Sequence, residues 1–393
     1  MSERTNHDTT PPEPGPPTHK GGRYGSLAFW HNLLVVLLVV LLGLHYGAGF
    51  LVPLAMALMI FVLLTAVIDR IARMRPGGLR IPRWVAQLLG LMLVVMGLGV
   101  IAAILSSQAQ DVVAAIPRYQ ARFAQIISKL VQFAGENITA QATAAMAKLD
   151  LSKVLGPVVG GAGSFLSSIV LVLLYIPFMM AERGPMRAKI ALAASSPGAA
   201  QEFSRVLRSI TKGLRRYVGI KTAVSLLTGS LSYAVMKPIG LDFAETWAVL
   251  AFALNFIPTI GSAIAVLIPA VVALVQFDTM TPFLIILLGC GAIQFVVGNI
   301  LEPSIAGKSL NLSPLMVILA LTFWTTVWGI PGALLSVPIT VCVLIILSHL
   351  PETRPLAILI SGDGRLPEPE PALPLAPAGQ PSTEGPKTQR DKI

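Results

Sequence analysis

The sequence predicts an all-α integral membrane protein with about eight membrane segments. Two of these, in the C-terminal third, are predicted to be broken or re-entrant, and a helical extracytoplasmic insertion is expected between the third and fourth. Of the 393 residues, 54% are hydrophobic and only 12% are charged, whereas globular chains carry about 25% charged residues. Apolar runs long enough to span a membrane recur along the chain, and the last two are too long for one straight crossing.

The two ends of the chain differ in composition from the middle. Residues 1–28 and 351–393 are polar and rich in proline, so both are predicted to be disordered cytoplasmic tails. The apolar run Leu33–Leu44 follows a leader that is too long for a signal peptide and has no clear small-residue cleavage site. The first helix is therefore expected to remain as a membrane anchor.

Five apolar runs precede the broken pair, at about residues 29–48, 51–68, 84–105, 164–182 and 218–236. Lysine and arginine concentrate after the second run and after the fourth, and the turn His45–Phe50 has neither. Because positive charge marks the cytoplasmic side, both termini are expected to lie inside. This pattern fits a multi-pass membrane protein, with transmembrane helices over 29–105 and a transmembrane transport core over 164–350.

Residues 106–163 lie outside the membrane on this orientation and are long enough to form a small helical domain. Apolar residues recur there at helical spacing, namely Phe123, Ile126, Ile127, Leu130 and Ala134. The helix either packs on its neighbours or lies on the bilayer surface. A lid or an oligomer contact is the alternative.

The two long runs each break at an Ile-Pro pair, Ile257-Pro258 and Ile330-Pro331. A straight helix of about 34 residues would reach roughly 51 Å, against about 30 Å of hydrocarbon. The stretches 243–277 and 314–349 therefore either cross once each with a break or enter and leave on one side as hairpins. Paired broken segments at bilayer depth indicate a transport site, because freed backbone groups are tolerated there only beside protein or a watery cavity.

Several functional classes are excluded by the side chains present. The net charge of +10 comes from arginines beside apolar runs, and no basic-aromatic module for nucleic acid occurs. Cys290 and Cys342 both lie inside apolar runs and are expected to be small buried hydrophobes, not a disulfide or a metal pair. The histidines show no ligand spacing, and no nucleophile–base pattern appears. No enzyme activity, metal or cofactor is predicted.

The C-terminal half contains motifs that resemble a known family. These are Tyr217-Val218-Gly219-Ile220-Lys221, Asn255-Phe256-Ile257-Pro258, Gln294, Leu301–Lys308, Leu312–Leu315 and Gly329–Pro338. At these residues the chain resembles the autoinducer-2 exporter family of bacterial permeases, and the resemblance covers about residues 25–350. It implies roughly eight membrane segments, a transport function and a homo-oligomer. Some members export the quorum-sensing signal autoinducer-2, and others resemble sodium/proton antiporters.

Polar residues around the first break and on the following run are candidate solute ligands. Asn255 offers two donors and an acceptor beside exposed half-helix ends, although it could instead only cap a kinked helix. Gln294 and Glu302 lie eight residues apart, on one helical stripe with Gly298 between them. The predicted substrate-binding residues are Asn255, Pro258, Gly261, Gln294 and Asn299.

Ion or proton coupling is assigned to Glu302 and Lys221. A carboxylate inside a membrane is costly and usually functional, but at the interface a hydrated Glu302 costs little. Lys221 could neutralise Glu302 or attract an anionic solute, or it could extend to the headgroups. Hinges or helix breaks are predicted at Pro303, Gly307, Gly329, Pro331 and Gly332, with close packing as the alternative role of the glycines.

The sequence thus predicts an efflux permease that moves a small polar organic solute out of the cell, with an autoinducer-2-like signal as the leading candidate. The expected partners are this solute, H⁺ or Na⁺, the lipid bilayer and further copies of the chain, and no nucleic acid. Two alternatives remain open. One is a sodium/proton antiporter of the same family, and the other is a membrane scaffold or regulatory protein that acts through residues 106–163.

Overall fold

The structure, a computed structural model, describes residues 24–74, 81–134, 168–194, 196–306 and 311–366. The chain separates into two units, Met1–Gly49 and Phe50–Ile393. In the first unit the described residues form α1 (Tyr24–Tyr46). Its large apolar side chains from Leu34 to Val40 are exposed, as expected for a helix that faces lipid.

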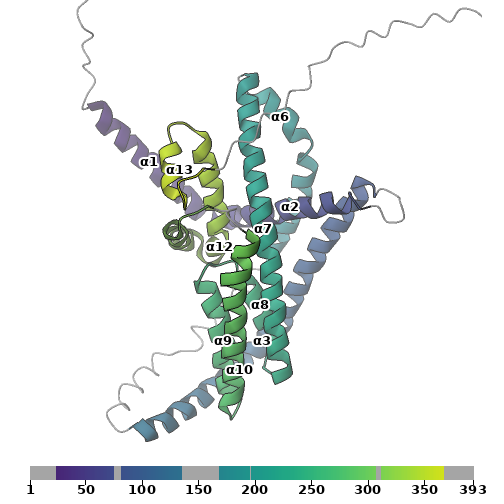
Figure 1. The fold of residues 1–393 in the computed structure, drawn as a ribbon, viewed down its shortest axis with the longest axis vertical. Helices are drawn as coiled ribbons and strands as arrows, with labels where there is room; N and C mark the ends of the chain where they lie inside the picture. The colour runs from purple at the N-terminus through teal and green to yellow at the C-terminus, as the bar shows by residue number, and fades with distance from the viewer. Residues whose placement is uncertain (1–23, 75–80, 135–167, 195, 307–310, 367–393) are drawn as a thin grey trace, which may run out of the picture. The chain divides into compact units, whose positions relative to one another are not determined.

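The described residues of the second unit are helical apart from turns and one isolated β-bridge. Figure 1 shows the arrangement. The helices are α2 (Ala48–Ile71), α3 (Arg83–Ala134), α6 (Pro185–Ala193), α7 (Pro197–Ile239), α8 (Ala244–Leu254), α9 (Ile260–Gln276), α10 (Met280–Val296), the π-helix η2 (Val297–Leu301), α11 (Glu302–Ala306), α12 (Pro314–His349) and α13 (Arg354–Ile360). A further apolar helix covers Ser168–Glu182.

By length and composition, five described helices could cross a membrane. They lie in α2, in the first half of α3, in α7, in the stretch from α10 to α11, and in α12. Four shorter apolar helices add to these, at Leu34–Tyr46, Ser168–Glu182, Ala244–Leu254 and Ile260–Gln276. The all-α membrane class is therefore confirmed. The count of eight segments stays a prediction.

Helix α3 does not end where the apolar run ends. It continues as one helix through residue 105 and on to Ala134, about 78 Å in all at the usual rise. No helix-breaking pair separates its apolar half from the amphipathic half that follows, and the single internal Pro117 is accommodated. The helical spacing from Phe123 onward thus belongs to a continuation of the third predicted span. Residues 135–163 of the predicted insertion lie outside the described residues.

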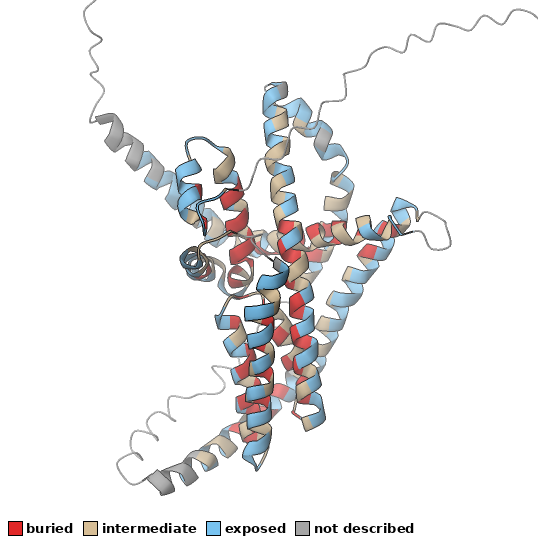
Figure 2. Ribbon diagram, viewed as in Figure 1, coloured by how far each residue is buried: buried red, intermediate tan, exposed pale blue. Residues whose placement is uncertain are grey.

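Helix α7 is the common packing partner in the second unit. It packs against α8, α10 and α12, and α10 packs in turn against α9 (Figure 1). In Figure 2 the buried residues lie on the facing sides of these helices, whereas the outer surface of α10 is exposed. An apolar surface on the outside of the helices is what a lipid environment favours.

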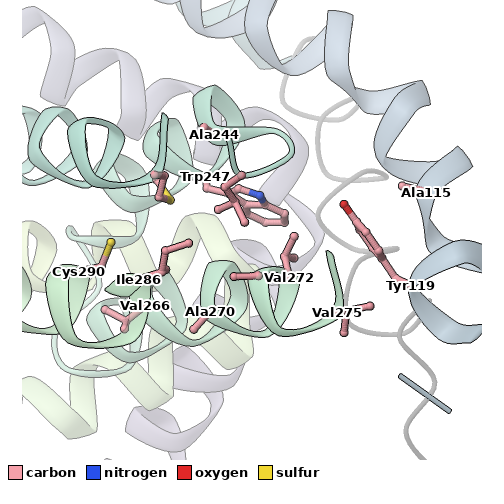
Figure 3. Close-up of a cluster of buried hydrophobic side chains, with 13 residues drawn as sticks. Ala115, Tyr119, Ala244, Trp247, Val266, Ala270, Val272, Val275, Ile286 and Cys290 are labelled. Carbon is pink, nitrogen blue, oxygen red and sulfur yellow. The ribbon is translucent and has the colours of Figure 1, made fainter. Parts of the chain in front are cut away.

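The far half of α3 docks where α8 begins and α9 ends. Figure 3 shows Ala115 and Tyr119 of α3 facing Trp247, Val272 and Val275, within one buried apolar cluster. Tyr119 is only 2% exposed, and its hydroxyl donates to the Asp242 carboxylate over 2.9 Å.

Two ion pairs reinforce this contact. Arg118 pairs with Asp242, which precedes α8, and Arg122 pairs with Asp278, which follows α9. Burial raises the pKa of Tyr119 above its ordinary value, and the hydrogen bond to Asp242 raises it further. The phenol therefore stays a donor at physiological pH.

Replacing Tyr119 by Phe should lower the free energy of unfolding by about 1.5–3 kcal/mol, because one hydrogen bond to a charged acceptor is lost while the ring stays packed. Tyr119→Ala should cost about 3–5 kcal/mol, since a buried ring leaves a cavity. Thermal unfolding of the detergent-solubilised protein measures both. Tyr46→Phe is the control, because Tyr46 is 82% exposed; equal shifts for Tyr119→Phe and this control would contradict the role of the hydroxyl.

The structure differs from the predicted C-terminal tail. A disordered stretch was expected from residue 351, but Arg354–Ile360 forms α13, which packs on α12. The following residues return to the start of α12, where Leu312 and Ser361 form a β-bridge and Ser313 N–H donates to Ile360 O over 3.0 Å. Prolines dominate the composition only beyond this short apolar helix, which is why composition placed the boundary too early. Residues 367–393 lie outside the described residues.

Candidate functional site

The first break lies between α8 and α9 and contains a strained residue. Thr259 has φ 61° and ψ −59°, and the N–H of Ile260 donates to Pro258 O over only 2.6 Å. These values describe a γ-turn with positive φ, a rare and strained conformation for a β-branched residue. Strain of about 1–3 kcal/mol persists only where the surroundings enforce it, and such positions cluster at functional sites.

The chain folds back on itself at this break. A β-carbon at Gly261 would lie 2.8 Å from the carbonyl carbon of Leu254, too close for any side chain. In a straight helix these residues, seven apart, would be separated by a rise of about 10 Å. Gly261 is therefore required by space, and α8 and α9 form a tight hairpin.

The second break, within α12, has the same construction. Gly329 has φ 63° and ψ −141°, a conformation that is essentially confined to glycine. A β-carbon at Gly332 would lie 2.7 Å from the carbonyl carbon of Trp324, eight residues earlier. The two arms of α12 therefore also fold back, and each break combines one residue of positive φ with one glycine held against a carbonyl group.

The two breaks meet in one small apolar cluster. Ile257 of the first break is buried with Leu321 and Ala333, which lie on either side of the second. An aromatic pair precedes each break: Phe252 and Phe256 have ring centroids 5.8 Å apart, and Trp324 and Trp328 have theirs 4.9 Å apart. The turns are thus packed against each other through aliphatic side chains, beside aromatic surfaces on their incoming arms.

Helix α7 holds the polar groups of this region. The Nδ2 of Asn255, which is 3% exposed, donates to the Ser225 Oγ over 3.0 Å. One helical turn earlier, the Lys221 Nζ donates to both carboxylate oxygens of Glu302, over 2.7 and 2.8 Å. The side chain of Lys221 is 8% exposed and that of Glu302 is 25% exposed. The first break and the segment after α10 are therefore attached to adjacent turns of one helix.

The segment between Gln294 and Glu302 is not a regular α-helix. Residues Val297–Leu301 form the π-helix η2, and Glu302 follows directly. A π-turn bonds i to i+5 and occurs frequently at functional sites. It changes the angular offset between Gln294 and Glu302 from the α-helical one on which the predicted stripe was based. From its place after this π-helix, Glu302 accepts from Lys221 with both of its oxygens.

Gln294 is the least satisfied polar group of the region. Its side chain is buried, the residue being 8% exposed, and neither Oε1 nor Nε2 has a hydrogen-bonding partner among the described residues. Leaving such a group unpaired costs about 1–3 kcal/mol. An amide in this state indicates a polar partner that the described residues do not provide. No cluster of three or more metal-ligating side chains occurs in the described part of the chain.

The structure brings some predicted site residues together and separates others. Asn255 and Gly261 lie at the first break, and Lys221 pairs with Glu302. Asn299 is exposed, and its Nδ2 donates to Phe295 O in its own helix. Pro303 is exposed next to Glu302. The remaining predicted residues divide as follows: Pro258, Gly329, Pro331 and Gly332 lie at the breaks, and Gly307 lies outside the described residues.

One residue of the site was not predicted from the sequence. Ser225 is fully buried, and it lies four residues after Lys221. A polar stripe at i, i+4, i+7 and i+11 along α7 consists of Lys221, Ser225, Thr228 and Ser232, and all four residues are buried. This spacing within an otherwise apolar run is a signal that the sequence contains.

Comparisons with known proteins agree on one class. Residues 34–352 match the family model described as AI-2E family transporter. The chain is 32% identical to the AI-2 transport protein TqsA of Escherichia coli K12, an alignment that covers 84% of this chain and 94% of that protein. It is 30% identical to a putative transport protein of Haemophilus influenzae (83% and 94% covered) and 28% identical to the putative transport protein YhhT of E. coli K12 (84% and 93%).

Proposed function

The chain belongs to the AI-2E family of transporters, and from this premise we propose that it exports a small, uncharged, hydroxylated solute of the autoinducer-2 type. The relative named for AI-2 transport supports this choice of cargo. The export direction and the quorum-sensing role are part of the same proposal.

The two folded-back breaks are proposed to be re-entrant hairpins at bilayer depth. The arms α8 and α9 have 11 and 17 residues, fewer than the roughly 20 that a crossing requires. Backbone groups at the turns then line the solute path, as in other transporters with broken helices. On this threading the chain has about eight membrane segments, both termini lie in the cytoplasm, and the protein resides in the bacterial inner membrane as a homo-oligomer.

The buried, unpaired amide of Gln294 is the single observation that carries the proposed binding role. A buried amide without a partner can donate to and accept from a solute hydroxyl at little desolvation cost, because it has already left water. Asn255 supplies a second amide at the first break. These two side chains are proposed as the solute ligands, with Pro258 and Gly261 shaping the turn.

Export of a neutral solute is favoured over sodium/proton antiport by the state of Glu302. Both of its oxygens accept from Lys221, so the carboxylate is compensated in place. Any coupling to H⁺ or Na⁺ through Glu302 must first break this pair. Coupling by Glu302 and Lys221 therefore stays a secondary proposal.

Accumulation of labelled autoinducer-2 tests the function. Cells that lack the protein should retain the label, and cells that express it should lose it. Asn255→Ala and Gln294→Leu should each reduce export at least tenfold at equal expression, because a polar contact to the solute is removed. Asn299→Ala is the matched control, since the Asn299 amide is exposed and bonds its own helix. Equal label in all strains would contradict the proposed cargo. Loss of export in Asn299→Ala alone would contradict Asn255 and Gln294 as the solute ligands.

A further inference from the structure

We propose that Ser225 is a positioning residue that fixes the orientation of the Asn255 amide, so that the site presents the carbonyl oxygen of Asn255 to the solute. This inference rests on the proposed function. It adds that the solute must donate a hydrogen bond to the carbonyl oxygen of Asn255. Ser225 itself does not touch the solute.

The contact between Ser225 and Asn255 joins two helices at the strained break. Ser225 is fully buried in the middle of α7, and Asn255 is the residue at which α8 ends. The Nδ2 of Asn255 donates to the Ser225 Oγ over 3.0 Å. Within the amide, Nδ2 and Oδ1 lie on opposite sides of Cγ, so this bond turns Oδ1 away from Ser225. A terminal amide rotates broadly about χ2 when nothing holds it.

A hydroxyl in the middle of a helix ordinarily serves its own backbone. Serine and threonine at such positions commonly donate to the carbonyl four residues earlier, as Thr228 does to Val224 O over 2.9 Å. Ser225 instead accepts from a side chain of another helix. Thr228 and Ser225 are both fully buried on the same helix. Comparing substitutions at the two residues therefore distinguishes a hydroxyl that bonds its own helix from one that bonds a neighbouring helix.

The chemical consequence concerns which solutes are accepted. A site that presents an acceptor discriminates strongly against an analogue without the matching hydroxyl, because its buried polar group is then left unpaired. A freely rotating amide can offer either its oxygen or its nitrogen and selects less. The loss of Ser225 should therefore weaken recognition at Asn255 and leave the translocation step itself intact.

The test is uptake of labelled autoinducer-2 into inside-out vesicles at matched protein levels, with KM and the maximal rate measured separately. Ser225→Ala should raise KM about fivefold, the effect of one hydrogen bond, and keep the maximal rate. In an Asn255→Ala background the same substitution should raise KM no further, because its only target is gone. Thr228→Val, the matched control, should leave KM unchanged.

Three results would overturn the inference while the proposed function stands: an unchanged KM in Ser225→Ala, an additional rise in the double variant, or a fall of the maximal rate together with the amount of folded protein. The last result would mark a purely structural hydroxyl. If vesicles with the intact protein take up no labelled autoinducer-2, the proposed function fails, and the inference that rests on it fails too.

Discussion

Alanine at Gly332 or at Gly261 is expected to abolish transport and to reduce the amount of folded protein sharply. At Gly332 the added carbon meets the backbone of Trp324, and at Gly261 it meets the backbone of Leu254. A backbone carbonyl cannot rotate away as a side-chain end can, so the whole turn must open. Overpacking of this kind costs about 1–3 kcal/mol and occasionally more, and here it acts on the segments proposed to carry the solute.

Size-exclusion profiles and thermal unfolding of the solubilised variants measure this effect. Gly291→Ala in α10 is the matched control, because a carbon added there meets no atom within 4 Å. The control should behave as the unmodified protein or gain up to about 1 kcal/mol from the better helix former. Wild-type behaviour of Gly332→Ala and Gly261→Ala would show that the two breaks do not fold back.

Removing one partner of the Lys221–Glu302 pair is the second large expected effect. Glu302→Gln should lower the free energy of unfolding by about 3 kcal/mol, because it leaves the ammonium group of Lys221 buried without its counter-charge. Lys221→Met should cost less, since Glu302 is the more exposed partner. Neutralising both should recover most of the loss, as replacements of buried ion pairs by apolar groups often do.

Chemical unfolding of the two single variants and the double variant measures this cycle. The exposed pair of Lys237 and Glu245, with side chains 57% and 30% exposed, is the control and should contribute no more than about 1 kcal/mol. Cation-driven pH changes in vesicles that vanish in Glu302→Gln, while the protein stays folded, would support antiport. A double variant less stable than either single variant would contradict the compensation by charge.

Much of the transport region follows from residue types and spacing alone. Two Ile-Pro pairs located both breaks, because proline removes a helix donor and both runs are too long for one straight crossing. The pairing of Lys221 with Glu302 was one predicted option, because two opposite charges near bilayer depth are costly apart. Both features follow from large local free-energy costs, a missing helix donor and an isolated charge in lipid, which few alternative structures avoid.

Other features depend on packing that the sequence does not display. The π-helix directly before Glu302 does not follow from the apolar pattern of its run. The positive φ of Thr259 is imposed by the hairpin, against the residue's own preference. Ser225 meets Asn255 only because α8 ends opposite it, and the polar stripe to which Ser225 belongs does not by itself identify this partner.

Helix α7 is continuous over 43 residues, about 64 Å of unbroken helix. Its exposed residue Phe203 precedes Lys221 by roughly 27 Å along the axis. A rigid rod of this length converts a tilt of a few degrees near the ion pair into a displacement of ångströms at its far end. The displacement of a spectroscopic label at Phe203 would therefore report a tilt of α7 near Lys221 and Ser225, without any label near the solute.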